Sequence, residues 1–402
     1  MSAISDDLMA RDVLVDPHSY YHALRAADPV HWNEMWGGWI LTRYTDVVDV
    51  LRDAERFSSD RMSYLARELS PQDQEKYRPI FDVLSQWMVF RDPPDHTRLR
   101  LLLNARFTPR MVERYRERVR AIVEDLLKPI EAKRTIDMVR EFAYLVPLTV
   151  ILELLGAPEL DRDLIKHWSE QLGVFFFLRA DEPRRRAIAC EGVTSLVEYL
   201  KPLIADRAAR PRADLTSELV AAQKEGRLSE QEVLATCVLL VFGGHETTMN
   251  LIANGTLAFC RFPAEWQHLK AQPQLIGPAV EELLRYDSSV KATVRWAKVE
   301  AQIGGKTIRA GDKMLIGLSA ANRDPQQFVD PDRLNIRRDP NPHVAFAHGI
   351  HVCLGAPLAR LEGQEAFAGL TRRLPPPRLT EQTLDYHPTV VSRALRALNV
   401  SF

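Results

Sequence analysis

Residues 343–362 read HVAFAHGIHVCLGAPLARLE, with a single cysteine near the middle. Cys353 lies between Gly349 and Gly355, and the residues that follow have the periodicity of a helix. A cysteine just before a helix is favoured as its thiolate, because the N–H groups and the dipole of the helix N-terminus stabilise negative charge. The two glycines permit a tight turn. The loop therefore suits a thiolate that is held and oriented.

Three hypotheses explain Cys353. It could be a buried structural cysteine in a glycine turn. It could bind zinc together with His343, His348 and His351, although their close spacing fits the common structural zinc patterns poorly. It could also be the thiolate ligand of a haem iron, which needs one cysteine and no second protein ligand. The loop by itself leaves all three open.

The stretch FAHGIHVCLG resembles the haem-binding signature of the cytochrome P450 superfamily, Phe-Gly-x-Gly-x-His-x-Cys-x-Gly. The sequence departs from that signature at Ala347, where the family usually has glycine. If this position has a positive φ, alanine costs about 1 kcal/mol of local strain. The matching residues are Phe346, Gly349, His351, Cys353 and Gly355.

Four more motifs resemble the same family and occur in its order. They are DPPDHTRLR, VFGGHETTMN, EELLR and FVDPDRL. Each short string is weak alone, but together they cover essentially the whole chain, which is identified as a member of the family. The matching residues are His96 and Arg100 in the first, Gly243, Gly244, Glu246 and Thr247 in the second, Glu282 and Arg285 in the third, and Arg333 in the fourth.

The resemblance implies a role for each of these residues. Cys353 would be the axial ligand of the iron of haem b, and Glu246 and Thr247 would relay protons during oxygen activation. Glu282, Arg285 and Arg333 would form a structural cluster that pins the coil leading to the cysteine loop. The two haem carboxylates would be met by His96, Arg100, Arg295 and His351, and Arg295 is otherwise an odd charge in the strand text TVRWA.

The longest helix is expected over 229–261, where Ser229 and Glu232 form an S-x-x-E capping box. Glycine inside a helix costs up to about 1 kcal/mol relative to alanine, so Gly243 and Gly244 need a reason. Missing side chains at these positions would let haem, dioxygen and substrate approach the helix face.

The implied activity is that of a haem-thiolate monooxygenase in secondary metabolism or catabolism. It would insert one oxygen atom of dioxygen into a medium-sized, mainly hydrophobic small molecule. Electrons would come from NAD(P)H through a ferredoxin or flavodoxin with its reductase, and Arg98, Arg106 or Arg110 could form a docking patch or merely a solvated basic face. The alternative is a haem-thiolate gas-sensing or carrier protein, which would need neither Glu246 nor Thr247.

The substrate pocket of this family draws on several separate segments, which here are largely apolar. Within them, Lys291 could meet a substrate carboxylate, although a lysine that points outward is commoner. Ser289 stands where relatives often carry proline. The candidate pocket residues are Met62, Trp87, Met88, Phe176, Val290, Thr293 and Val391.

Composition limits the class of protein. The 402 residues carry 53 Lys and Arg against 54 Asp and Glu, which predicts no nucleic-acid partner. The acidic start lacks the features of a secretory signal, and no apolar run is long enough to span a bilayer, so we expect a cytoplasmic monomer without membrane insertion. The other three cysteines, expected to be small core residues, are Cys190, Cys237 and Cys260.

Helical periodicity predominates, so the predicted fold is mainly α with a minor antiparallel β part, forming one large domain over 1–402. Residues 60–92 are expected to be a long loop with one short helix, and Pro147 is expected to kink or divide a helix over 138–158. The predicted β-rich portions are roughly 30–42, 290–320 and 385–402. The principal predicted helices are 17–29, 44–58, 161–176, 184–207, 229–261, 274–286 and 355–373.

Overall fold

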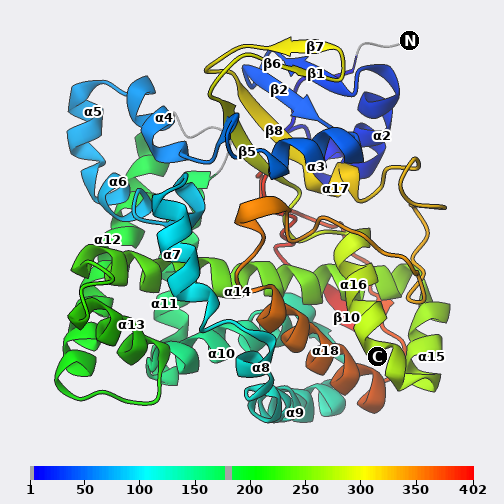
Figure 1. Cartoon of the computed structure of the whole chain (residues 1–402). Helices are drawn as coiled ribbons and strands as arrows, with labels where there is room; N and C mark the ends of the chain where they lie inside the picture. The colour runs from blue at the N-terminus through cyan, green and yellow to red at the C-terminus, as the bar shows by residue number, and fades with distance from the viewer. Residues whose placement is uncertain (1–3, 177–182) are drawn as a thin grey trace. The chain divides into compact units, whose positions relative to one another are not determined.

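The computed structural model describes residues 4–176 and 183–402, and its elements are labelled in Figure 1. Most of the described elements are helical. The α-helices are α1 (Arg11–Val15), α2 (Pro17–Ala27), α3 (Tyr44–Arg52), α4 (Arg61–Glu68), α5 (Pro71–Lys76), α6 (Arg78–Leu84), α7 (Asp95–Asn104), α8 (Pro109–Glu113), α9 (Arg116–Lys133), α10 (Leu145–Leu155), α11 (Arg162–Gly173), α12 (Pro183–Ala209), α13 (Leu215–Lys224), α14 (Glu230–Arg261), α15 (Pro263–Ala271), α16 (Ile276–Tyr286), α17 (Leu318–Ala321) and α18 (Ala356–Arg373).

Short turns of other helix types join these helices. Five of them, among the described residues, are 3₁₀ turns, and the remaining one is a π turn just before α10. The 3₁₀ turns are η1 (Met88–Phe90), η3 (Glu159–Asp161), η4 (Val174–Phe176), η5 (Pro273–Leu275) and η6 (Gly349–His351), and the π turn is η2 (Val139–Ala143). The predicted break near Pro147 is confirmed, and it lies at Tyr144, just before α10.

The strands of the described residues form three small sheets. They are β1 (Val30–Asn33), β2 (Gly38–Leu41), β3 (Phe57–Ser58), β4 (Thr135–Asp137), β5 (Ala292–Ala297), β6 (Ala301–Ile303), β7 (Lys306–Ile308), β8 (Lys313–Gly317), β9 (Arg378–Leu379) and β10 (Asn399–Ser401). The largest sheet has the order β1-β2-β8-β5-β3, in which only the β2–β8 pair is parallel. The smaller sheets are β4-β10-β9 and β6-β7. A mainly helical fold with a minor, mostly antiparallel β part is therefore confirmed.

The chain divides into two compact units. Unit 1 consists of residues 1–58, 107–146 and 247–402, and unit 2 consists of residues 59–106 and 147–246. Every strand of the described residues belongs to unit 1. The prediction of one domain over 1–402 stays a prediction.

Two apolar cores lie among the described residues of unit 1. One lies around the five-stranded sheet, and α2, α3 and α17 lie beside that sheet in Figure 1. The other core is built from the C-terminal half of α14 together with α9, α16 and α18. Phe259 and Phe367 illustrate it, since both are fully buried and their rings lie edge to face at 5.6 Å. Apolar burial of this kind fixes α18, and with it the loop that carries Cys353.

Unit 2 is helical, and here one expectation is wrong. Residues 60–92 form α4, α5, α6 and η1 instead of a long loop with one helix. Asp60 and Ser70 cap α4 and α5 by accepting hydrogen bonds from the backbone N–H groups of Ser63 and Asp73. Helices this short are stabilised by capping and tertiary packing, which leave no clear apolar period in the sequence.

The predicted elements near the candidate site are present. The capping box of α14 is formed, with Ser229 N donating to Glu232 at 2.9 Å and Glu232 N donating to Ser229 Oγ at 3.1 Å. Cys237 is buried, as expected of a small core residue, whereas Cys190 and Cys260 are only half-buried. Among the described residues, no helix combines the length and the apolar character that a membrane span requires.

Candidate functional site

The Cys353 loop is a tight turn at the N-terminus of α18. Cys353 is exposed, and its backbone N donates to the carbonyl of Phe346 at 2.9 Å. Gly349 has φ +72°, and a Cβ atom there would lie 2.3 Å from the carbonyl oxygen of Leu51. Ala347 also has a positive φ, of 59°, so alanine occupies a left-handed conformation that favours glycine. The expected strain at this position is therefore present.

One carboxylate of α16 holds the segments on both sides of Cys353. Glu281 lies 3.0 Å from His343 Nε2, and it accepts two hydrogen bonds from Arg360, at 2.7 and 2.9 Å. The guanidinium of Arg360 also lies over the ring of Phe346. Burial would raise the pKa of Glu281, but the bonds from His343 and Arg360 lower it to about 2.

These contacts bear on the zinc hypothesis. His343 is engaged by Glu281, and His348 accepts a hydrogen bond from Arg52 Nε at 2.8 Å. Within residues 4–176 and 183–402, no group of three His, Cys, Asp or Glu side chains is arranged to hold a metal ion. The described geometry thus gives no support to a zinc site at Cys353.

The Glu-x-x-Arg pair is fully buried. Arg285 Nε and Nη2 each donate to Glu282 at 2.8 Å. Arg285 also donates to the carbonyls of Asn322 and Pro331, at 2.8 and 2.9 Å. The pair therefore binds the coil that leads to the cysteine loop.

The third member of this cluster differs from the sequence interpretation. Arg333 meets the pair through its backbone carbonyl, which accepts from Arg285 Nη2 at 3.3 Å, and its side chain is exposed. The second guanidinium at Glu282 belongs to Arg338, whose Nε lies 3.2 Å from both carboxylate oxygens. Several arginines follow one another in this coil, and sequence spacing does not say which of them turns inward.

The four residues proposed for the haem carboxylates lie in both units. In unit 2, His96 and Arg100 are one helical turn apart on α7, and His96 is buried. In unit 1, Arg295 is buried on β5, where it donates to the carbonyl of Val294 at 2.9 Å, and His351 is half-buried in η6. Each unit thus supplies two polar side chains of the predicted set.

The two glycines of α14 differ in their surroundings. A Cβ atom on Gly244 would lie 2.9 Å from Ile151 Cδ1, so this glycine permits close packing against α10. A Cβ atom on Gly243 would have only Leu239 within contact, at 3.9 Å. Only Gly243, which is exposed, has the open surroundings that the sequence argument expected of both.

The proposed proton-relay residues follow directly on α14. Glu246 and Thr247 are half-buried, and Glu246 Oε2 lies 3.9 Å from where a Cβ atom on Gly173 would be. In unit 1, the next residue, Thr248, donates a hydrogen bond to Glu362 of α18, which is buried. Burial raises the pKa of Glu362 well above its usual value, which favours the neutral form of this carboxyl.

Sequence reasoning missed Glu362. An available signal was an acidic residue between Leu361 and Gly363, in a helix that must pack against α14. Its Oε2 atom is buried and has no hydrogen-bond partner among the described residues. A buried carboxyl therefore lies beside Thr248, one residue beyond the expected relay pair.

The pocket candidates of unit 2 belong to an aromatic cluster. The ring of Trp87 stacks on those of Phe90, Phe176 and Phe242 at centroid distances of 5.7, 6.1 and 5.5 Å. Met62 and Met88 are buried, as Trp87 is. Phe90 and Phe242 were missed, although Phe242 directly precedes the glycine pair. The unit 1 candidates, Val290, Thr293 and Val391, are half-buried.

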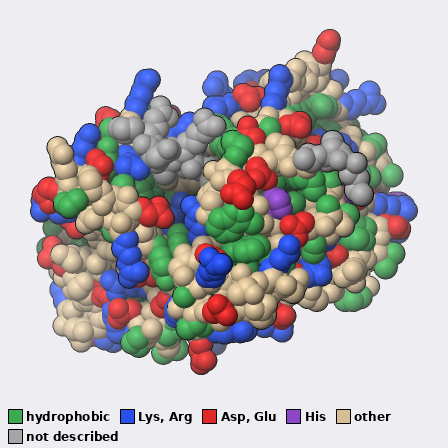
Figure 2. Space-filling view, turned by 90° about the horizontal axis from the view of Figure 1, so that it is seen from above, with side chains coloured by type: hydrophobic (Ala, Val, Ile, Leu, Met, Phe, Trp, Pro, Cys, Tyr) green, Lys and Arg blue, Asp and Glu red, His purple; other side chains and the backbone are tan. Residues whose placement is uncertain are grey.

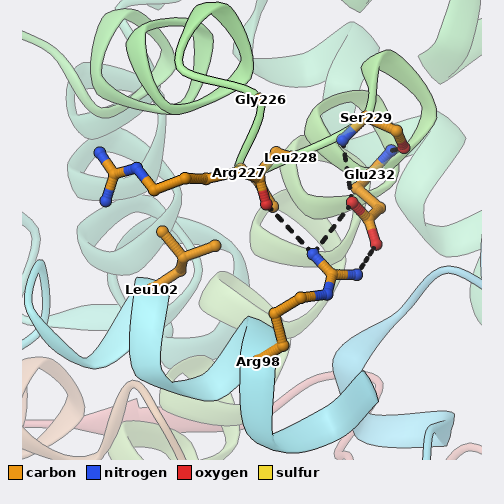
Figure 3. Close-up of a pocket in the computed structure, with 7 residues that line it drawn as sticks. All are labelled: Arg98, Leu102, Gly226, Arg227, Leu228, Ser229 and Glu232. Carbon is orange, nitrogen blue, oxygen red and sulfur yellow. Dashed lines mark hydrogen bonds and ion pairs between the residues drawn. The ribbon is translucent and has the colours of Figure 1, made fainter. Parts of the chain in front are cut away.

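Most of the expected docking arginines are engaged within the protein. Arg98 of α7 forms an ion pair with Glu232 and donates to the carbonyl of Arg227 at 3.1 Å (Figure 3). Burial would raise the pKa of Glu232, but Arg98 and the N–H of Ser229 lower it. These residues line a surface pocket of about 480 Å³ together with Leu102, Gly226 and Leu228.

Arg106 likewise pairs with Glu218 at 3.0 Å, whereas Arg110 is exposed and has no ion pair in the described part of the chain. On the face shown in Figure 2, basic and acidic side chains are interspersed, as the net charge of −1 predicts. Of the three candidate docking residues, Arg110 alone is both exposed and outside an ion pair among the described residues.

Comparison with known proteins identifies the family. The family model described as Cytochrome P450 matches residues 31–261 and 261–374. The chain belongs to the cytochrome P450 family, and it is an oxidoreductase of the monooxygenase class. The cofactor that this family implies is haem, as the Cys353 signature predicted.

Two curated relatives show how fully the likeness extends. The chain is 37% identical over 404 residues to the "Biotin biosynthesis cytochrome P450" of Bacillus subtilis (strain 168), covering 99% of each chain. It is 41% identical over 369 residues to the "Vitamin D(3) 25-hydroxylase" of Pseudonocardia autotrophica, covering 90% of this chain and 88% of the relative.

A solved structure agrees with the fold. It is the crystal structure of P450BioI in complex with hexadec-9Z-enoic acid ligated acyl carrier protein, which matches with a TM-score of 0.90 and 37% identity over 97% of this chain and 99% of that one. The predicted family and fold class are therefore confirmed.

Proposed function

We propose that this chain is a haem-thiolate monooxygenase that inserts one oxygen atom of dioxygen into a medium-sized, mainly hydrophobic small molecule. The observation that carries the proposal is the Cys353 loop. Its cysteine is exposed in a turn that requires positive φ at residues 347 and 349, and Glu281 holds the segments on both sides. Such a loop presents one thiolate in a fixed place.

The residues present fit haem b. Cys353 would ligate the iron, with Gly355 at the start of α18 and Phe346 bound beneath Arg360. When bound, a haem with a thiolate ligand supplies the activation of dioxygen. Arg295 is a buried cation, and buried cations need an anion or several acceptors. Arg295 and His351 of unit 1, and His96 and Arg100 of unit 2, would bind the haem carboxylates.

The other side chains position groups and move protons. We assign the carboxylate of Glu246 and the hydroxyl of Thr247 to proton transfer, since a carboxyl group and a hydroxyl group can each take up and release a proton. Gly243 keeps a stretch of α14 free of side chains. Apolar substrate contacts would come from Phe176 and Trp87 in unit 2 and from Val290, Thr293 and Val391 in unit 1.

Electrons would come from NAD(P)H through a ferredoxin or flavodoxin and its reductase. We assign the docking of that partner to Arg110 and Arg114, which are exposed and outside ion pairs in the described part of the chain. Arg110 lies in α8 and Arg114 directly follows it, and α8 packs against α18, which begins at the cysteine loop. Opposite charge on an acidic partner would steer association.

This docking assignment is tested by replacing both arginines with glutamate. The double variant R110E and R114E is expected to slow reduction by an acidic ferredoxin about tenfold at low salt, and less at high salt. R140E is the matched control, because Arg140 is 81% exposed in η2 of the same unit. An equal effect of R140E, or a rate independent of salt, would contradict the assignment.

Cellular role and substrate belong to the same proposal. The relatives include a biotin biosynthesis cytochrome P450 and a vitamin D(3) 25-hydroxylase, which supports an oxidation of small molecules in secondary metabolism or catabolism. We propose that the protein works as a cytoplasmic monomer.

A spectrum tests the central claim. The reduced protein with bound carbon monoxide is expected to absorb at about 450 nm, which is the signature of a thiolate-ligated haem. C353S should lose this band, whereas C190S, a cysteine on α12 of unit 2, should keep it. A normal band in C353S would sink the assignment. A protein with the band but without substrate-dependent consumption of NAD(P)H, given its redox partners, would instead be a gas sensor or carrier.

A further inference from the structure

Lys291 is a buried cation that none of the roles above uses. Lys291 is only 4% exposed. It therefore points into the protein, whereas a lysine at the end of a strand usually points outward. Nζ donates to the carbonyl of Thr389 at 2.7 Å. In the described part of the chain it forms no ion pair with a carboxylate. A buried ammonium with a single neutral acceptor has unused hydrogen-bonding capacity.

The acidic group that acts on Lys291, Asp287, is already bound by other side chains. Asp287 pairs with Arg393 at 3.2 Å and lies 3.4 Å from His18. The pKa of Lys291 is lowered to about 7, mainly by burial and next by the positive charge of Arg393, which outweighs the opposing effect of Asp287. The charges around Lys291 thus disfavour its ammonium form, and an additional anion would stabilise that form.

The backbone pairing of residues 289–291 determines the face on which the Lys291 side chain lies. Val290 bridges Ser392, Lys291 N donates to Val391 O at 2.6 Å, and Arg393 N donates to Ser289 O at 2.8 Å. The segment is therefore extended, and alternate residues of an extended segment share a face.

That face brings several polar groups together. It carries Ser289, Lys291, Thr293 and Arg295 in succession, and the hydroxyl of Ser289 is buried with no hydrogen-bond partner among the described residues. Thr293 and, across the bridge, Val391 are pocket candidates from the sequence. We place Lys291 in the unit 1 wall of the proposed substrate pocket, beside the buried Ser289 hydroxyl, which can still form a hydrogen bond.

We propose that Lys291 is a specificity-determining residue that binds an anionic group of the substrate, a carboxylate on an otherwise apolar molecule. The inference rests on the proposed monooxygenase function, because it places this carboxylate in the substrate pocket. The Nζ group would add a charge-assisted hydrogen bond to its bond with Thr389, and Ser289 Oγ would donate a second one. Apolar neighbours such as Val391 would contact the rest of the molecule.

The alternative is that Lys291 is only a tie between β5 and the turn at residues 389–391. The two roles predict different behaviour. A tie is indifferent to the charge of the substrate, whereas an anion-binding group distinguishes an acid from its ester.

The test compares matched ligands by the shift of the haem absorption band on binding. Dodecanoic and tetradecanoic acids are titrated against their methyl esters, which keep the apolar chain and remove the charge. The wild-type protein is expected to bind the acids about tenfold more tightly than the esters, and K291M is expected to lose that preference. K306M is the control, since Lys306 is an exposed lysine on β7 of the same unit.

Other variants keep the outcome decisive. K291R retains the charge and is expected to retain most of the preference for acids, and K291Q replaces K291M if the latter does not fold. Equal affinity for acid and ester in the wild type, or a preference for acids that survives in K291M, would overturn the proposal. The carbon monoxide spectrum distinguishes failure of the proposed function from failure of the proposed role of Lys291. A normal band at about 450 nm together with no preference for acids refutes only the role of Lys291.

Discussion

Two regions of unit 1 each contain a buried cation, but they differ in how many hydrogen bonds that cation donates. In the anchor region, comprising Glu281, Glu282, Arg285, Arg338, His343 and Arg360, Arg285 has two bonds to a carboxylate and bonds to three carbonyls. In the wall region, residues 289–293 with 389–393, the ammonium of Lys291 donates one hydrogen bond among the described residues, to the carbonyl of Thr389. A fully satisfied cation holds a fold together, whereas an incompletely satisfied one reduces stability and remains available to a ligand. The two regions should therefore respond oppositely to removal of the cation.

The largest effect is expected in the anchor region. R285M leaves the Glu282 carboxylate buried and removes the bonds to Asn322 and Pro331, so the free energy of unfolding should fall by about 3–5 kcal/mol. Denaturant unfolding followed by circular dichroism measures this loss. A loss below about 1 kcal/mol would show that the anchor region is not what holds the coil.

The wall region should respond in the opposite direction. The pKa of Lys291 is about 7 in the folded protein, and in the unfolded chain it has its usual value of 10.5. Between these two pH values the unfolded state therefore binds more protons than the folded state. The burial penalty is complete below pH 7 and disappears as the pH rises toward 10.5. K291M should therefore raise the free energy of unfolding by about 1–3 kcal/mol near pH 6, after the lost bond to Thr389 is allowed for.

That stabilisation should shrink between pH 7 and pH 10, which unfolding curves of both proteins across this range would measure. The other charged or titratable groups near Lys291 are Asp287, Arg393, His18 and Tyr386, and they are common to both proteins. A difference between the two proteins that does not change with pH would contradict the assignment.

A smaller effect separates the two arginines of the anchor coil. Arg338 lies against Glu282 through its guanidinium, whereas Arg333 contributes its carbonyl, which mutation of the side chain preserves. R338Q should cost about 1–3 kcal/mol in unfolding free energy, and R333Q less than about 0.5 kcal/mol. Equal losses of unfolding free energy in R338Q and R333Q would show that the side chain of Arg333 also has a structural role.

The smallest effect concerns backbone strain in the loop that the anchor region holds. Ala347 has φ +59°, so A347G should raise the free energy of unfolding by up to about 1 kcal/mol. Thermal unfolding measures this gain, and the haem absorption bands report whether the loop geometry changes with it. A loss of stability would mean that packing of the alanine methyl group outweighs the strain.

The sequence predicted the site better where chemistry constrains the residue type. The cysteine loop, the capping box of Ser229 and Glu232, and the Glu282–Arg285 pair all depend on particular side chains at fixed local spacing. Local spacing is preserved in the fold, so these predictions agreed with the described contacts.

Features that depend on tertiary packing were not predictable in this way. The choice of Arg338 over Arg333 depends on how an irregular coil turns, and the burial of Lys291 and Glu362 depends on neighbours far along the chain. The short helices α4, α5 and α6 lack a clear apolar period for the same reason. Gly244 belongs to the recognised motif, but the reason for a glycine there differs from the expected one. Its lack of a side chain permits packing against Ile151 and does not open the helix face to ligands.

The bonds of Glu281 have one more consequence, for the entropy of the Cys353 loop. His343 and Arg360 lie on opposite sides of Cys353 in the chain, and both bind this one carboxylate. The loop between them is thus closed when the chain folds, and the loss of its conformational freedom belongs to folding. A group that binds to Cys353 afterwards meets a loop that is already ordered, so its affinity is not reduced by the entropy of ordering it.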